Sequence, residues 1–155
     1  MGLARNLKVD SVSRLHPTPP WCVHPDQSVA EAVRLMRQHQ VGCLLVCEGD
    51  TLLGIFTERD LMREVMAAGR PLTLPVSSCM TPHPVTVLPN APISAAVRLM
   101  EEGGYRHLPV LDATGKPVGV LSVKRIVHYL VEHYSSTIYN LPPRPDAYPL
   151  EPEGA

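Results

Sequence analysis

The sequence predicts an α/β fold in which two copies of one small unit form a pseudo-twofold pair packed through their sheets. The stretch PDQSVAEAVRLM at residues 25–36 recurs as PNAPISAAVRLM at residues 89–100, with six identities in twelve positions. Farther along, LLGIFTERDL at residues 52–61 corresponds to PVGVLSVKRI at residues 117–126. Two copies are too few for a solenoid. A chain of 155 residues also has enough apolar side chains for one shared core rather than two independent ones.

Each copy is expected to start with a short strand followed by an amphipathic helix. Proline-rich stretches at residues 16–25 and 80–89 exclude helix and lead into short strands at Val23 and Val87. Apolar residues then recur with the helical spacing i, i+3, i+4 and i+7. These residues are Val29, Ala32, Val33 and Met36 in the first copy and Ile93, Ala96, Val97 and Met100 in the second.

Two short apolar runs follow each helix and predict a β-hairpin, after which the helical spacing returns. Ser28 with Glu31 predicts a capping box at the first helix, and Gly103-Gly104 marks the end of its counterpart. Each copy therefore reads strand, helix, strand, strand, helix. The expected hairpin strands are Cys43–Cys47, Leu52–Phe56, His107–Leu111 and Val118–Leu121. The expected helices are Val29–Gln38, Glu58–Ala68, Ala95–Glu102 and Lys124–His133.

Composition argues against several classes of partner. A formal charge of −1 from 14 basic and 15 acidic residues gives no electrostatic attraction to nucleic acid. The sequence shows neither a signal-peptide hydrophobic stretch nor an unbroken apolar run long enough for a membrane span. We therefore expect a cytoplasmic protein with reduced cysteines, no nucleic-acid partner and no membrane.

These segments together resemble a tandem pair of cystathionine-β-synthase-type (CBS) domains, also called a Bateman module. The resemblance rests on the repeated order of elements, on the phrase MTPHPVTVLPNAPISAAVRLM, and on a hairpin that ends in the motif GIFTERD at residues 54–60. We place the first CBS repeat at residues 8–75, the second at 76–137, and a proline-rich, disordered tail at 138–155. Because no companion catalytic domain is present, a stand-alone pair is expected.

The resemblance implies a regulatory sensor with two clefts between the repeats, each able to hold AMP, ADP, ATP or S-adenosylmethionine. In the family, a hydroxyl residue and an aspartate at the hairpin exit, where the second hairpin strand passes into the next helix, contact the ribose. In this sequence these two residues are Thr57 and Asp60. At the second exit, Ser122 matches the hydroxyl residue, but Arg125 replaces the aspartate and cannot accept a hydrogen bond. That cleft either does not take adenosine in the usual pose or prefers an anionic group.

Further ligand contacts are implied by the strand that opens the second hairpin. Family members often bind phosphate with basic residues at this place, which here are Arg106 and His107, whereas the first repeat has Gly42 and Cys43. Adenine typically lies against the backbone of the opposite repeat, at the stretch that ends with Pro109. The Asp60 cleft thus lacks phosphate-binding residues of its own repeat, and the Arg125 cleft lacks the carboxylate that contacts ribose. We therefore expect binding at a single site.

Alternatives without a nucleotide stay open. Thr57 and Asp60 also suit a plain helix cap, and Arg106 with His107 also suits a solvated strand edge. A structural or protein-interaction module is the main alternative. A thiol or zinc sensor, with Cys22 and His24 beside Cys79 and His83, is a third, although their spacing matches no metal motif.

No catalytic motif is found, so an enzyme is not predicted and no obligatory cofactor is expected. The resemblance implies a homodimer formed through the helices, because apolar faces left exposed after the pair has closed its core require a partner. The ligand is expected to change the arrangement of the repeats and so to alter affinity for an unknown regulated protein in signal transduction.

Overall fold

The computed structural model describes the backbone of residues 3–139 and the side chains of residues 5–133. Residues 140–155, most of the tail predicted to be disordered, lie outside the described part. Among the described residues, no helix combines the length and apolar character needed to cross a bilayer. The elements are α1 (Leu3–Val9), η1 (Val12–Leu15), β1 (Cys22–Val23), α2 (Val29–His39), β2 (Cys43–Glu48), β3 (Thr51–Thr57), α3 (Glu58–Asp60), η2 (Leu61–Met66), η3 (Val76–Ser78), β4 (Thr81–Pro82), α4 (Ile93–Gly103), β5 (His107–Leu111), β6 (Pro117–Ser122) and α5 (Val123–Tyr139).

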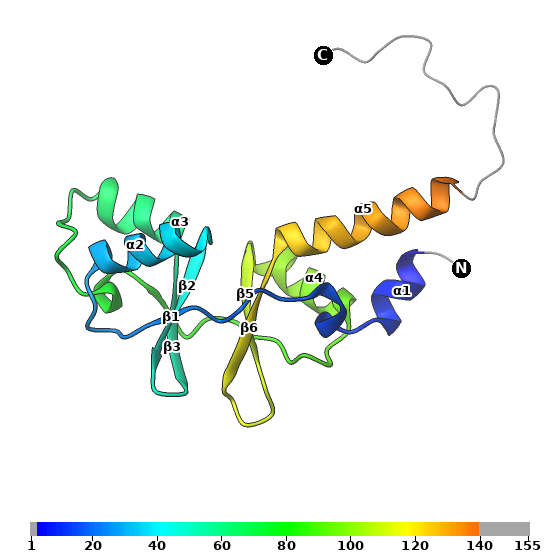
Figure 1. Ribbon diagram of the computed structural model, residues 1–155, viewed down its shortest axis with the longest axis horizontal. Helices are drawn as coiled ribbons and strands as arrows, with labels where there is room; N and C mark the ends of the chain where they lie inside the picture. The colour runs from blue at the N-terminus through cyan, green and yellow to red at the C-terminus, as the bar shows by residue number, and fades with distance from the viewer. Residues whose placement is uncertain (1–2, 140–155) are drawn as a thin grey trace, which may run out of the picture.

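Both hairpins predicted from the sequence are present, and Figure 1 shows them side by side with their turns pointing the same way and the helices near their other ends. In the first repeat, β1 pairs parallel with β2, which pairs antiparallel with β3. In the second repeat, an isolated parallel bridge from Val87 to Val110 takes the place of β1. The short strands expected at Val23 and Val87 therefore both join their sheets.

Each sheet is completed by the segment that leads into the other repeat. Thr18, in the N-terminal part of the first repeat, exchanges two backbone hydrogen bonds of 2.9 Å with Val120 in β6. In the same way β4, near the start of the second repeat, pairs antiparallel with β3. The dark blue N-terminal segment can be followed in Figure 1 as it crosses from the second repeat to the first. Two crossing segments, one that contains Thr18 and one that contains β4, thus join the repeats.

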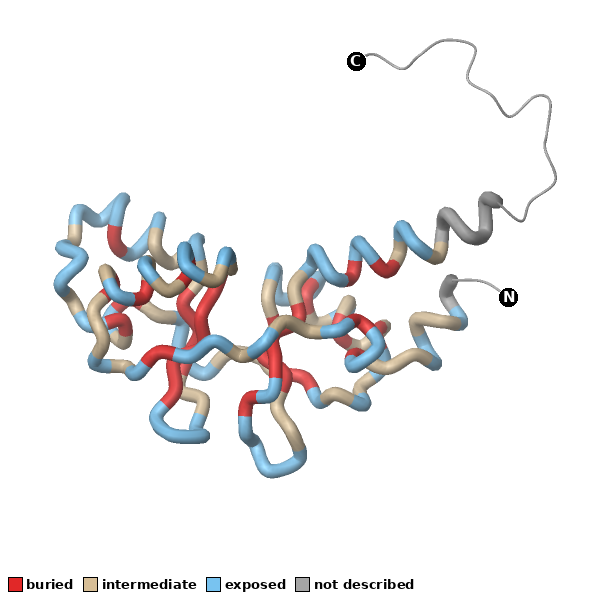
Figure 2. Tube along the Cα trace, viewed as in Figure 1, coloured by how far each residue is buried: buried red, intermediate tan, exposed pale blue. Residues whose placement is uncertain are grey.

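The buried residues form one cluster in each repeat and a smaller one between them, along the strands that appear red in Figure 2. The cluster of the second repeat includes Val12 and Leu15, which belong to the N-terminal part of the first repeat in the sequence. A hydrogen bond of 2.6 Å from the Tyr129 hydroxyl to Asp10 Oδ2 also fastens this N-terminal segment to α5. The cluster between the repeats contains Cys43, Leu45, Cys47, Ile55 and Val120.

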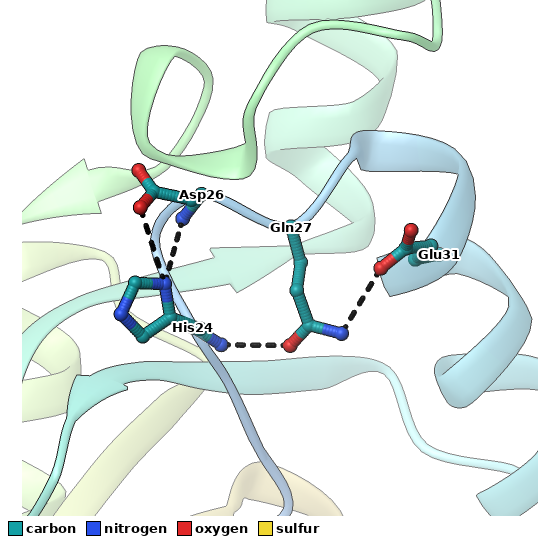
Figure 3. Close-up of polar contacts among 4 residues, drawn as sticks. All are labelled: His24, Asp26, Gln27 and Glu31. Carbon is teal, nitrogen blue, oxygen red and sulfur yellow. Dashed lines mark hydrogen bonds and ion pairs between the residues drawn. The ribbon is translucent and has the colours of Figure 1, made fainter.

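Only half of the capping box predicted for Ser28 and Glu31 is present at the start of α2, and the other half of the prediction is wrong. The Glu31 amide donates to Ser28 Oγ over 3.1 Å, as expected for an N-cap. The Glu31 carboxylate, however, accepts from Gln27 Nε2 over 3.0 Å instead of turning back to the Ser28 amide. Gln27 Oε1 in turn accepts from the His24 amide over 2.8 Å, as Figure 3 shows. A side-chain bridge therefore replaces the second half of the box.

The helix expected at Glu58–Ala68 is also different. It begins as one α-helical turn, α3, and continues as a π-helix, η2, in which the Ala67 amide donates to the Met62 carbonyl. Bonds of this i to i+5 type widen the turn. In the second repeat the equivalent helix α5 is α-helical and runs from Val123 to Tyr139, beyond the expected end at His133.

Candidate functional site

The first hairpin exit holds the predicted pair, Thr57 and Asp60, in a reciprocal cap. Thr57 ends β3, and its amide and its hydroxyl donate to Asp60 Oδ2 over 2.9 Å and 3.0 Å. The Asp60 amide donates to Thr57 Oγ1 over 3.2 Å. This complete capping box satisfies amides at the start of α3 and fixes the carboxylate in space. The capping alternative left open by the sequence is therefore present.

A third residue, which sequence reasoning missed, completes the arrangement. The hydroxyl of Thr81, in β4, donates to Asp60 Oδ1 over 2.9 Å. Because β4 leads into the second repeat, this bond joins the ribose candidate of one repeat to the chain that enters the other. The only signal in the sequence is that Thr81 lies in the phrase MTPHPVTV, on which the resemblance rests.

The second exit keeps the backbone of the first but changes its chemistry. The Glu58 amide donates to the Gly42 carbonyl over 3.1 Å, and at the second exit the Val123 amide donates to the Arg106 carbonyl over 3.0 Å. Ser122 Oγ accepts from the Arg125 amide over 3.3 Å, and this bond corresponds to the one from the Asp60 amide to Thr57 Oγ1. Arg125 is exposed and brings a positive charge to the place that Asp60 occupies in the first repeat.

His107 lies beside the first exit, although it belongs to the second repeat. The site where a β-carbon on Gly42 would stand is 3.5 Å from His107 Nε2 and 2.9 Å from Glu58 Oε1. Burial lowers the pKa of His107, while the negative charge of Glu58 acts in the opposite direction. A neutral imidazole at pH 7 can still donate one hydrogen bond to a ligand that enters between the repeats.

The remaining predicted residues are spread over β5 and its start. Arg106 is exposed, and its carbonyl is bound within its own repeat. Pro109 is buried in β5 opposite Val120, and its carbonyl accepts from the Val87 amide. The structure therefore gathers Thr57, Asp60 and His107 near one exit.

An open pocket of about 690 Å³ lies elsewhere, between the two hairpin turns. Asp50 and Thr51 line it from the first turn, and Thr114 and Lys116 line it from the second. None of the predicted ligand-binding residues contributes to this lining. Since Thr57 and Ser122 end their strands at the opposite end of the hairpins, we place the candidate site at the hairpin exits.

The zinc alternative is not supported by the positions of its cysteines. Cys79 is 1% exposed and belongs to the core cluster of the first repeat. The sulfur beside Cys22 is instead that of Cys47, at 3.4 Å. Within residues whose side chains are described, no group of three or more His, Cys, Asp and Glu residues is arranged to hold a metal ion.

Comparisons with known proteins agree with the arrangement. The CBS domain model matches residues 12–67 and again residues 76–132. The CBS domain-containing protein YhcV of Bacillus subtilis is 35% identical over 115 residues, which are 74% of this chain and 81% of YhcV. The mitochondrial CBS domain-containing protein CBSX3 of Arabidopsis thaliana is 34% identical over 127 residues, which are 78% of this chain but only 61% of CBSX3.

Solved structures show the same fold. A CBS-domain containing protein from Agrobacterium tumefaciens superposes with a TM-score of 0.72 and 31% identity, over 78% of this chain and 99% of the other. The crystal structure of CBSX2 in complex with AMP gives a TM-score of 0.67 and 28% identity, over 80% of this chain and 98% of the other. The similarity thus extends over both repeats.

Proposed function

The chain belongs to the CBS domain family and carries two CBS domains in tandem, and from this premise we propose that it is a non-catalytic regulatory protein that binds an adenosine-containing ligand at the Asp60 exit. The observation that carries the proposal is the Asp60 carboxylate, which Thr57 and Thr81 hold in place from two elements. The complex of the related protein CBSX2 with AMP supports the ligand class.

The hydrogen bonds of Asp60 leave it able to accept one more. A carboxylate offers about four lone-pair sites on its two oxygens. Thr57 uses two of them at Oδ2, and Thr81 uses one at Oδ1. A ribose hydroxyl can take the remaining position as a charge-assisted hydrogen bond, at a carboxylate that needs no reorganisation before binding.

The contact with Thr81 offers a route from ligand to conformation. A ribose hydroxyl that takes the free position on Oδ1 shares this oxygen with the Thr81 hydroxyl, and β4 is held to β3 by only two paired residues. The ligand then favours the position of β4 in which the Thr81 hydroxyl holds the Asp60 carboxylate ready for the ribose. Differential affinity for two arrangements is all that regulation requires. We propose that the regulated protein binds the two arrangements with different affinity.

Titration calorimetry with AMP, ADP, ATP and S-adenosylmethionine tests the proposal. Asp60→Asn keeps a carbonyl oxygen for the Thr57 amide but removes the charge, so we expect affinity to fall about tenfold to a hundredfold, as for a lost charge-assisted hydrogen bond of about 1.5–3 kcal/mol. Asp26→Asn is the matched control, because that side chain is 86% exposed and lies before α2.

The titration also decides between the two functions. Saturable binding that survives Asp60→Asn would move the ligand to another site. If none of the four ligands binds the wild-type protein, the interaction module, which the arginine at position 125 already favours, replaces the sensor. Thermal melting with each ligand provides an independent readout, because a ligand that binds only the folded state raises Tm.

We propose a second copy of this chain as the partner that covers the exposed helix face. Met62 and Met66 in η2 are 63% and 67% exposed, and the equivalent Val127 and Val131 in α5 are 48% and 56% exposed. Matched apolar pairs on two pseudo-equivalent helices suit an isologous contact. Sedimentation should show a dimer that Met62→Glu converts to monomer, whereas Val118→Glu on β6, 44% exposed in the wild-type protein, leaves it intact.

A further inference from the structure

Two cysteines from neighbouring strands bring their sulfur atoms together. The parallel pairing of β1 with β2 sets Cys22 opposite Leu45, and Cys47 lies two residues farther along the same face. The two Sγ atoms are 3.4 Å apart. Cys22 is exposed, whereas Cys47 is buried at 6% exposure. A solute can therefore reach the Cys22 thiol directly, whereas the Cys47 thiol is shielded from solvent.

The hydrogen bonds give the two thiols different roles. The Cys47 thiol donates to Cys22 Sγ, which lowers the pKa of Cys22 against the opposing effect of its burial. The same bond, together with burial, raises the pKa of Cys47. Thiolates are the reactive form of cysteine, and Cys22 is the thiol of the pair that solvent reaches, so Cys22 is the nucleophile. A reactive thiol beside a second thiol is the arrangement found in redox-sensitive sites.

We propose that Cys22 and Cys47 form an oxidisable dithiol site whose oxidant is hydrogen peroxide. The Cys22 thiolate attacks one peroxide oxygen, the O–O bond breaks, and Cys22 becomes a sulfenic acid as hydroxide leaves. Cys47 then attacks the Cys22 sulfur, the S–O bond breaks and water leaves with the Cys47 proton. Two thiols and one peroxide give one disulfide and two waters, and a thiol reductant reverses the change.

Closing the bridge requires a small movement of the chain. A disulfide bond is about 2.05 Å long, so the sulfurs must approach by about 1.4 Å from their present 3.4 Å. Strand β1 contains only two residues, and the β2 ladder with β3 has an irregularity between Val46 and Cys47. Cys22 therefore lies on a short strand and Cys47 beside an irregularity of the ladder.

The bridge would act on the connection between the repeats. Cys22 follows Thr18 by four residues, and Thr18 is fixed to Val120 of the second repeat by two backbone hydrogen bonds. Cys47 packs in the cluster between the repeats, which also contains Val120. A bond from Cys22 to Cys47 would thus fasten both ends of the crossing segment. The dithiol lies at the turn end of β2, away from Asp60, so the proposal does not depend on nucleotide binding.

Peptide mapping after peroxide treatment tests the site. The reduced full chain is exposed to hydrogen peroxide at low protein concentration, blocked with N-ethylmaleimide and digested without reductant. We expect a linked peptide that joins Cys22 to Cys47, lacks the mass of two hydrogens and disappears on reduction. A Cys22 that goes on to sulfinic acid or links to a second chain, while Cys47 stays a free thiol, would overturn the proposal.

Single substitutions separate the two roles. In Cys47→Ser the serine hydroxyl still donates to Cys22, so the sulfenic acid should form and persist, and dimedone should trap it. In Cys22→Ser the buried Cys47 should stay unmodified. Cys79→Ala is the control and should form the bridge as the wild-type protein does. Equal dimedone labelling of Cys22 in the wild-type protein and in Cys47→Ser would show that Cys47 does not resolve the sulfenic acid.

Discussion

Gly54→Ala probes the contact on which the candidate site depends. The backbone of Gly54 does not have a positive φ, so alanine is compatible with its conformation. An alanine β-carbon, however, would stand 2.8 Å from the Thr81 carbonyl oxygen and 2.5 Å from Met80 Sδ. The methionine side chain can swing away, whereas the Thr81 oxygen is part of β4 and moves only with that strand.

The expected loss of stability follows from two opposing effects. Overpacking costs about 1–3 kcal/mol, and replacing glycine by alanine returns about 0.4–1 kcal/mol because the unfolded chain has fewer conformations. The mid-range values leave a net loss of about 1.3 kcal/mol, and each kcal/mol lowers Tm by about 2–4 °C in a chain of this size. Displacement of β4 also moves the Thr81 hydroxyl from Asp60, so nucleotide affinity should fall as well.

Gly119→Ala is the matched control at the pseudo-equivalent position. Its β-carbon would lie 3.0 Å from Pro17 Cβ and 3.1 Å from the Thr18 carbonyl oxygen, so it crowds the other crossing segment. Thermal melting followed by calorimetry with AMP should show both variants destabilised and only Gly54→Ala weakened in binding. An unchanged Tm in Gly54→Ala, or equal loss of affinity in both variants, would refute the link between β4 and the site.

Three further predictions concern single side chains. Tyr129→Phe removes the bond to Asp10 and should lower the free energy of unfolding in urea by about 1.5 kcal/mol, with no loss if the N-terminal segment is held by packing alone. Burial lowers the pKa of His107 from its ordinary 6.5, so the unfolded chain takes up the proton first. Stability should therefore fall as pH drops from about 7 through 6.5 to the folded pKa, and His107→Gln should flatten this part of the profile. Arg125→Asp supplies a carboxylate beside Ser122 and should raise nucleotide stoichiometry from one to two per chain, whereas an unchanged stoichiometry would mean that the second exit lacks more than this charge.

The sequence predicts the local elements well because their signals are local. Helices α2 and α4 follow from apolar residues at helical spacing, and the fold confirms them within a few residues at each end. The π-helical turn η2 has no such signal, since Leu61, Val65 and Met66 fit α-helical spacing equally well. The choice between the two depends on packing against the rest of the repeat.

Contacts between distant segments could not be predicted in this way. Nothing in the residues around Thr81 indicates that its hydroxyl reaches Asp60, and nothing near Cys22 indicates that Cys47 is its neighbour. Both contacts depend on strand register across the crossing segments, and register is set by the whole sheet rather than by either segment alone. The cytoplasmic location and the repeat boundaries stay predictions.

The two hairpin exits show how the repeats have come to differ. The backbone bond from Glu58 to Gly42 and the one from Val123 to Arg106 have nearly the same length, 3.1 Å and 3.0 Å. Each exit also keeps a hydroxyl cap on its helix. The difference therefore lies in side-chain chemistry, where one exit has a carboxylate that accepts hydrogen bonds and the other has a guanidinium that only donates them.

This asymmetry bears on how a two-repeat protein would respond to a ligand. A ligand that occupied both exits equally would act symmetrically on the two crossing segments. A ligand held at Asp60 alone acts on β4 and leaves the contact of Thr18 with Val120 as it is. Under the proposed function, such one-sided binding would change the relation between the repeats, because it would alter one of the two connections and not the other. In the proposed sensor, the arginine at position 125 would therefore confine the ligand to the first exit and make its effect one-sided.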